Sequence, residues 1–137
     1  MGLIYADIIL KNVSDVIAEK RGYIKKPEVR QTNVRAMVDT GTLMFVINEE
    51  VRQILGLKTE GEKQVSLANE TIEVCKVTEP VEIHWKNRYT VVQALVLESA
   101  NEVLLGAIPL EGMDLMVNPV KQELVGAHGE EAVYIIK

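Results

Sequence analysis

The residues best suited to chemistry are Asp39-Thr40-Gly41-Thr42, a polar and turn-prone segment set between two apolar runs. The segment offers a carboxylate, two hydroxyl groups and a glycine within four residues. A carboxylate held at a fixed point between two strands can take protons from a bound water or give them to a substrate. Asp and Gly are also ordinary turn residues, so an ordinary hairpin turn is the alternative interpretation.

Two phosphate-handling interpretations of this motif fail because other parts are missing. The first phosphate loop of actin-like and Hsp70-like ATPases contains Asp-x-Gly-Thr, but that fold needs two large lobes, more than 137 residues supply. The aspartyl-phosphate nucleophile of ion-pumping ATPases is followed directly by Lys, whereas Thr40 follows the acid here. Neither chemistry suits this chain.

Short strands separated by turn signals predict an all-β domain with one or two short helices. Strands are expected at residues 3–10, 32–38, 43–47, 80–85, 89–97, 102–106 and 130–137, and hairpins at 63–74 and 114–126. Residues 11–30 contain several turn formers and predict a long irregular connection or a wide hairpin. The motif at Asp39 therefore lies between two strands that must position it.

One helix is expected directly after the strand at residues 43–47. Asn48 is a suitable N-cap, and Glu49 and Glu50 would lie in the first turn, where the helix dipole favours acids. Gly56 is a suitable stop. A second helical segment is expected at residues 107–113.

The ordered set of motifs resembles the retropepsin-like aspartic proteases, the retroviral type that also has small prokaryotic relatives. Asp39-Thr40-Gly41, preceded by an apolar strand, is similar to the active-site loop of that family. Val103–Gly106, followed by a short helix, is similar to the apolar-apolar-Gly element that crosses under that loop. The resemblance covers about residues 30–125 and implies an acid-protease half-barrel. We expect residues 1–137 to form this single domain.

The resemblance implies that Asp39 is the catalytic acid, that Thr40 and Gly41 hold it, and that Thr42 and Gly106 support the loop. Peptide hydrolysis at a water needs one group to accept a proton and another to donate one. The sequence contains Asp-Thr-Gly only once. The second carboxylate is therefore expected from a second copy of the chain, in a two-fold homodimer with an Asp39/Asp39 pair.

The hairpin tip predicted within residues 63–74 is the candidate for a flap that closes over a peptide substrate. Its residues are Leu67, Ala68, Asn69, Glu70 and Thr71. Glu70 is expected to disfavour acidic residues in the peptide. A surface hairpin without a substrate role is the alternative.

One departure from the family concerns the pairing of the subunits. Ala107 stands where the retroviral enzymes have an Arg that helps to join the subunits. Dimerisation is then expected to depend on apolar surface and on the terminal strands at residues 3–9 and 132–137. A catalytically silent dimerisation or peptide-binding module with the same fold is the rival interpretation.

Composition limits the remaining function classes. The net charge of −5 argues against nucleic acid as a partner. Cys75 is the only cysteine and the two histidines lie far apart, so we expect no disulfide, no metal site and no cofactor. No apolar run is long enough to span a bilayer, and the start of the chain lacks a basic leader. A cytoplasmic location is the expectation.

Overall fold

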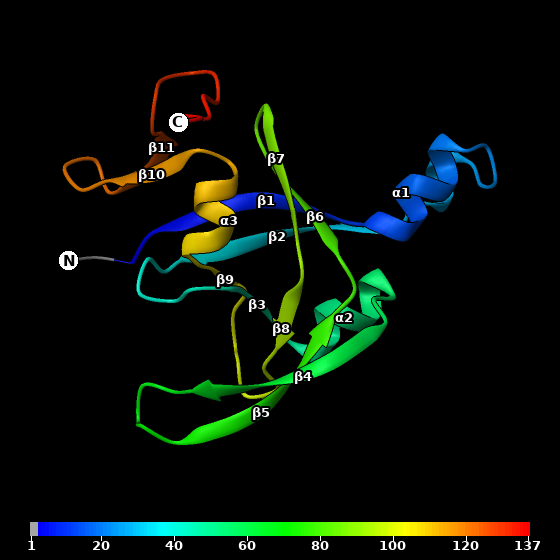
Figure 1. Ribbon diagram of the computed structural model, residues 1–137, viewed down its shortest axis with the longest axis horizontal. Helices are drawn as coiled ribbons and strands as arrows, with labels where there is room; N and C mark the ends of the chain where they lie inside the picture. Colours follow the sequence, from blue (N-terminus) through cyan, green and yellow to red (C-terminus); the bar gives the residue numbers. More distant parts are fainter. Residues whose placement is uncertain (1–2) are drawn as a thin grey trace.

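Nine strands form one mixed sheet in the computed structural model, which describes residues 3–137 (Figure 1). The sheet order is β4-β5-β8-β3-β9-β2-β1-β6-β7. The strands are β1 (Tyr5–Asn12), β2 (Gln31–Val38), β3 (Phe45–Ile47), β4 (Thr59–Ser66), β5 (Ile72–Thr78), β6 (Val81–Trp85), β7 (Arg88–Val92), β8 (Ala94–Val96) and β9 (Leu104–Leu105). The predicted all-β class is confirmed.

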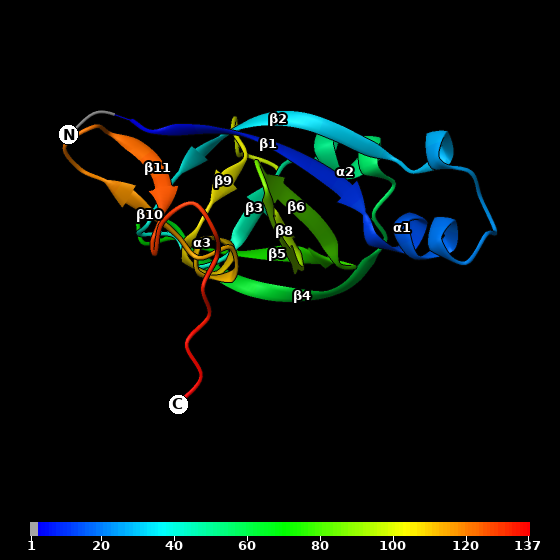
Figure 2. The ribbon, with the colours of Figure 1, turned by 90° about the horizontal axis from the view of Figure 1, so that it is seen from above.

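A separate hairpin and a few short helices complete the molecule. They are β10 (Leu115–Asn118), β11 (Glu123–Gly126), α1 (Val13–Lys20), α2 (Glu49–Leu55), α3 (Ala107–Gly112) and the 3₁₀ turn η1 (Lys26–Glu28). In both ribbon views α1 lies at the opposite end of the molecule from the β10–β11 hairpin (Figures 1 and 2). The helix α3 packs against β7 and β10.

The core forms because apolar residues alternate along the strands. In β1, Ile8 and Leu10 are buried whereas Ile9 between them is exposed. Val51 and Leu55 of α2 pack into the same cluster. Burying each such aliphatic side chain contributes about 1.5–3 kcal/mol.

The predicted boundaries of α2 are confirmed. The side chain of Asn48 accepts a hydrogen bond from the amide of Val51, and Gly56 adopts the left-handed conformation that ends the helix. Glu49 and Glu50 lie in the first turn. This helix follows β3 directly and packs against β1 and β2.

The wide hairpin that was one expectation for residues 11–30 is confirmed, since the flanking strands β1 and β2 pair antiparallel. The other expectation, an irregular connection, is wrong for its first part, because α1 forms there. The side chain of Asn12 accepts a hydrogen bond from the amide of Asp15 and caps this helix. Asp15 also pairs with Arg30 at 2.8 Å, which fixes the helix to the start of β2. The described residues therefore contain one α-helix more than the sequence predicted.

The strand expected at residues 89–97 is two strands in the structure. β7 pairs with β6, whereas β8 pairs with β3 and β5, and the chain changes neighbours at Gln93. The hairpin predicted at residues 114–126 is confirmed as β10 and β11.

The prediction of a last strand at residues 130–137 is wrong, since no ladder forms in that segment. A strand needs a neighbour, and the single chain offers this segment none. The first strand, one of the terminal strands expected to help pair the subunits, is an edge strand only in its first half, because β1 pairs with β2 from Tyr5 to Lys11 and also with β6 from Ile9 to Asn12. The described part of the chain holds no helix that meets the length and hydropathy of a membrane span.

Candidate functional site

The loop that carries Asp39 follows β2 and is fixed from beneath by β9. Val38 pairs in parallel with Leu105, and the amide of Asp39 donates to the carbonyl of Leu105 at 3.1 Å. The amide of Thr42 donates to the carbonyl of Asp39 at 3.1 Å and closes a tight turn. β9 also pairs antiparallel with β3. The short apolar strand therefore joins both sides of the loop, as the sequence predicted.

The carboxylate of Asp39 is oriented by its own loop. The amide of Gly41 donates to Oδ1 at 3.0 Å, and the hydroxyl of Thr42 donates to Oδ2 at 2.8 Å. Asp39 is half-buried, whereas Thr40 and Gly41 are exposed. Two donors thus fix the plane of the carboxylate and leave it open to one side.

Gly106 is required by the close approach of the loop. A Cβ at this position would lie 2.3 Å from the carbonyl oxygen of Met44 and 2.5 Å from that of Thr42. The first amides of α3 continue the contact, since Ala107 donates to Thr42 and Ile108 donates to Leu43, both at 2.8 Å. Strand β9 and helix α3 therefore hold the loop through its backbone.

Contacts within the single chain do not require glycine at position 41 as they do at position 106. A Cβ there would lie 3.4 Å from Oδ1 of Asp39, which is ordinary van der Waals contact. The single chain leaves room for alanine at this position.

The segment before β9 is anchored to the first strand. The hydroxyl of Tyr5 donates to Oε1 of Glu102 at 2.7 Å, and the guanidinium of Arg35 lies 4.4 Å from the centre of the Tyr5 ring. The hydrogen bond to Glu102 is the main cause that raises the pKa of Tyr5 above its usual value. This contact fixes the chain directly ahead of the apolar-apolar-Gly element.

The β4–β5 hairpin has the polar tip that the sequence predicted. The amide of Leu67 donates to the carbonyl of Thr71 at 2.9 Å, and the side chain of Asn69 accepts from the amide and the hydroxyl of Thr71. Glu70 has a positive φ of 68°. Ala68, Asn69 and Glu70 are exposed, whereas Leu67 is half-buried. The tip is thus a closed turn, and in both ribbon views it lies at the same end of the molecule as the loop after β2 (Figures 1 and 2).

The structure brings together four of the residues singled out from the sequence: Asp39, Gly41, Thr42 and Gly106. Thr40 lies beside them, and its hydroxyl has no hydrogen-bond partner within residues 3–137. The five tip residues lie on a separate element, with no hydrogen bond to the loop in that same range.

Two apolar residues beside the loop were missed by the sequence analysis. Leu43 is 65% exposed and Ile108 is 43% exposed, and their backbones are hydrogen-bonded to each other. Their exposure could not be read from the sequence, because both lie within apolar runs that look buried. They form an exposed apolar surface beside the loop that carries Asp39.

The described residues contain no group of three His, Cys, Asp or Glu side chains placed to hold an ion. Cys75 is buried, and burial raises the pKa of its thiol. The arrangement suits proton exchange at one oriented carboxylate.

Comparison with known proteins agrees with this fold. Residues 26–108, more than half of the chain, match the family described as aspartyl protease. The structure is similar to that of EIAV protease complexed with the inhibitor HBY-793, with a TM-score of 0.51 and 22% sequence identity. The alignment covers 58% of this chain and 76% of that one, and at this identity it speaks for the fold. No curated protein matches the chain.

Proposed function

This chain belongs to the aspartyl protease family, and from that membership we propose that it is one subunit of an aspartic endopeptidase. Its fold is the retropepsin-like one that the sequence predicted. The observation that carries the proposal is the Asp39 carboxylate, since each of its oxygens accepts a hydrogen bond from the loop. Asp-Thr-Gly occurs once in the sequence, so the second catalytic carboxylate is Asp39 of another copy.

The proposed chemistry follows from placing two carboxyl groups close together. Two such groups about 3 Å apart share one proton, because both cannot ionise at that distance. The ionised member takes a proton from a water, and the protonated member gives its proton to the oxygen of the scissile carbonyl. The titration belongs to the pair, so neither copy has a fixed role. Gly41 and Thr42 keep each carboxylate oriented, which lowers the reorganisation needed during the reaction.

Leu43 and Ile108 support a two-fold contact at this place. Both are apolar, exposed and adjacent to the loop. A second copy placed with its loop against this one would remove them from water, which favours association. This apolar contact would replace the Arg-based pairing that Ala107 excludes.

The two-fold arrangement also accounts for Thr40 and Gly41. In the dimer the free hydroxyl of Thr40 lies where it can hydrogen-bond to the partner loop. The absence of a Cβ at Gly41 lets the backbone of the second loop approach. The hydroxyl of Thr40 and the missing Cβ of Gly41 then serve the pair of loops, whereas the amide of Gly41 orients Asp39 within its own chain.

A peptide is the proposed substrate, lying in an extended form between the two loops and the two β4–β5 hairpins. The hairpin tips, residues 67–71, would close over it and exclude bulk water. The carboxylate of Glu70 would then repel acidic side chains in the peptide.

The proposal is tested with Asp39→Asn, which keeps the size of the side chain and removes its proton chemistry. Cleavage of a peptide library should fall by about 10²–10⁴-fold. Asp7→Asn is the matched control, because Asp7 is an exposed acid on β1, and it should cleave like the parent. Circular dichroism and sedimentation of Asp39→Asn should match those of the parent.

Mixing the two proteins tests the shared site. Adding an equal amount of Asp39→Asn to a fixed amount of parent should lower the activity to about half after the subunits exchange, because mixed dimers are inactive. Unchanged activity would show that one copy is sufficient. A parent chain that pairs but cleaves no peptide from about pH 3 to pH 7 would identify the silent module instead.

A further inference from the structure

A second group of charged residues lies at the junction of α3 and β10, away from the Asp39 loop. Asp114 is 8% exposed and adopts a positive φ of 54°, which is uncommon for a residue with a side chain. Its carboxylate accepts a hydrogen bond from the amide of Val133 at 2.9 Å and contacts Nδ1 of His128 at 2.8 and 3.0 Å. Nη1 of Arg88 lies 3.8 Å from the same carboxylate. Asp114 therefore connects the C-terminal segment, residues 127–137, to the body of the molecule.

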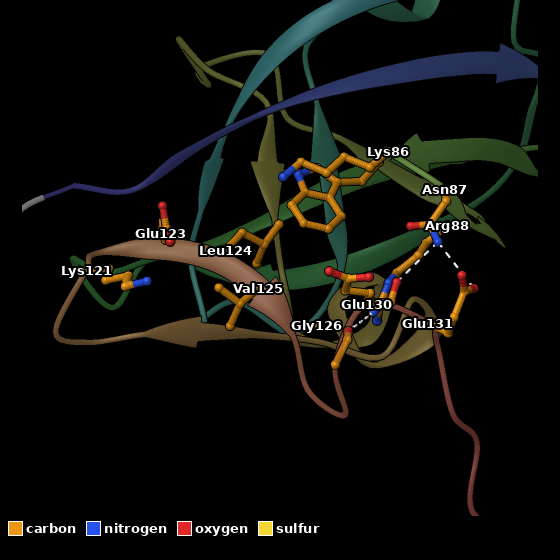
Figure 3. A pocket seen from close by; sticks show the side chains of 12 residues that line it. Lys86, Asn87, Arg88, Lys121, Glu123, Leu124, Val125, Gly126, Glu130 and Glu131 are labelled. Atoms are coloured by element: carbon orange, nitrogen blue, oxygen red, sulfur yellow. Dashed lines mark hydrogen bonds between the residues drawn. The ribbon is translucent and has the colours of Figure 1, made fainter.

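Arg88 provides a permanent charge on the inner side of this junction. Its side chain is 2% exposed and donates to the carbonyls of Met113 at 3.1 Å, of Asp114 at 2.6 Å and of Gly129. Figure 3 shows Arg88 beside Glu130 and Glu131, at the wall of the pocket that the segment borders. Arg88 therefore places a buried guanidinium on the inner side of the Asp114 carboxylate.

We propose that Asp114 and His128 form a proton-controlled clamp, which holds the C-terminal segment when His128 is protonated and loosens it when His128 is neutral. The geometry carries this inference. His128 is the only titratable side chain of the segment in contact with Asp114 among the described residues, and its side chain is 44% exposed, so it exchanges protons with solvent. Histidine ordinarily changes charge between pH 5 and 8.

The charged groups around His128 come from three elements. Asp114 faces it from the α3–β10 junction, Arg88 lies behind Asp114 on β7, and Glu130 and Glu131 follow it in the same segment. The hydrogen bond from Val133 is the first cause that lowers the pKa of Asp114, followed by His128 and Arg88. Because its pKa is lowered, Asp114 stays ionised at pH values where an ordinary aspartate would already be protonated. The stabilising contribution of Asp114 is therefore lost only as the pH falls through this lowered pKa.

The sign of the response follows from these two titrations. A protonated histidine adds a charge to the hydrogen bond with Asp114, and this contribution disappears as the pH rises through the histidine range. The clamp is thus stronger when the imidazole of His128 carries a proton while Asp114 is ionised. A neutral imidazole can still donate through Nδ1, so the contact weakens at higher pH without vanishing.

Loosening the clamp affects an apolar stretch of chain. Val133, Tyr134, Ile135 and Ile136 are 48%, 57%, 66% and 94% exposed. In Figure 2 the end of the chain leaves the body of the molecule. The Val133 amide is tied to Asp114, and the Tyr134 hydroxyl to the carbonyl of Gly112 at 2.8 Å. The clamp therefore determines whether this apolar stretch is attached to the body of the molecule at Val133. This role does not depend on whether the chain is a peptidase.

The test is the protection of the Val133 amide against solvent exchange, measured by NMR on the full chain and corrected for the intrinsic rate. From pH 5.5 to pH 8 the protection should fall about two- to fivefold, the range of a partly exposed ion pair. The amide of Met37, which donates to Val103 at 2.9 Å in the sheet, is the internal control and should not change.

His128→Gln separates a proton switch from a merely structural contact, because glutamine can donate a hydrogen bond but cannot be protonated. In this variant the protection of Val133 should be the same at both pH values. Asp114→Asn, which keeps an acceptor oxygen, should also remove the pH response. An unchanged pH response in His128→Gln, or no response in the parent, would overturn the proposal.

Discussion

At the scale of the residue, Asp39 is distinguished by how completely its neighbours orient it. The Gly41 amide and the Thr42 hydroxyl each occupy one carboxylate oxygen. Hydrogen bonds to an ionised group are stronger than those between neutral groups. The loop thus fixes the orientation of one carboxylate. The proposed chemistry needs two carboxylates oriented in this way and facing each other.

Thr42 gives a prediction at this scale. Thr42→Val keeps the shape of the side chain and removes the donor to Oδ2, so kcat/KM for peptide cleavage should fall about tenfold or more. Thr42→Ser keeps the donor and should stay within about twofold of the parent. Full activity in Thr42→Val would show that the hydroxyl does not orient the carboxylate.

The local motif was predictable because its bonds are local. Gly41 and Thr42 lie two and three residues from Asp39, so residue types alone indicate the contacts. The clamp around Asp114 was not predictable, because Arg88 and His128 lie 26 and 14 residues away. Nothing in the spacing of these residues marks them as neighbours.

At the scale of the element, β9 and α3 act as the support of the loop. Their contacts to Thr42 and Leu43 are all made through backbone atoms, so side-chain changes on the loop leave the support intact. The support depends on the absence of a side chain at Gly106.

Gly106→Ala tests this support. The added methyl group would meet two carbonyl oxygens at 2.3 and 2.5 Å, so the loop must move. We expect the free energy of unfolding to fall by about 1–3 kcal/mol in urea denaturation, together with a loss of peptide cleavage. Gly61→Ala is the matched control, since its methyl group would meet nothing within 4 Å. Equal stability of the two variants would contradict the role of Gly106.

Some of the helices and strands could be predicted from the sequence, and others could not. The caps of α2 are sequence-local, and both were found in place. α1 has no buried residue, so it lacks the apolar stripe that reveals a helix in sequence. Residues 130–137 have strand-forming side chains, but strand formation depends on a partner that the sequence cannot specify.

At the scale of the whole molecule, a single chain supplies one of the two catalytic carboxylates that the proposed chemistry needs. One oriented carboxylate, an exposed apolar surface beside it and an unexplained glycine all lie on the same loop region. A two-fold axis through that region would account for the three features together. The order of the sheet was not predictable, because it depends on pairings between segments far apart in the chain.

The most direct test of the account is the distance between the two Asp39 carboxylates in a crystal structure of the dimer. We predict that their nearest oxygens lie about 3 Å apart, close enough to share a proton and to bind one water between them. A separation above about 5 Å in every assembly, or a chain that stays monomeric at crystallisation concentrations, would contradict the shared site.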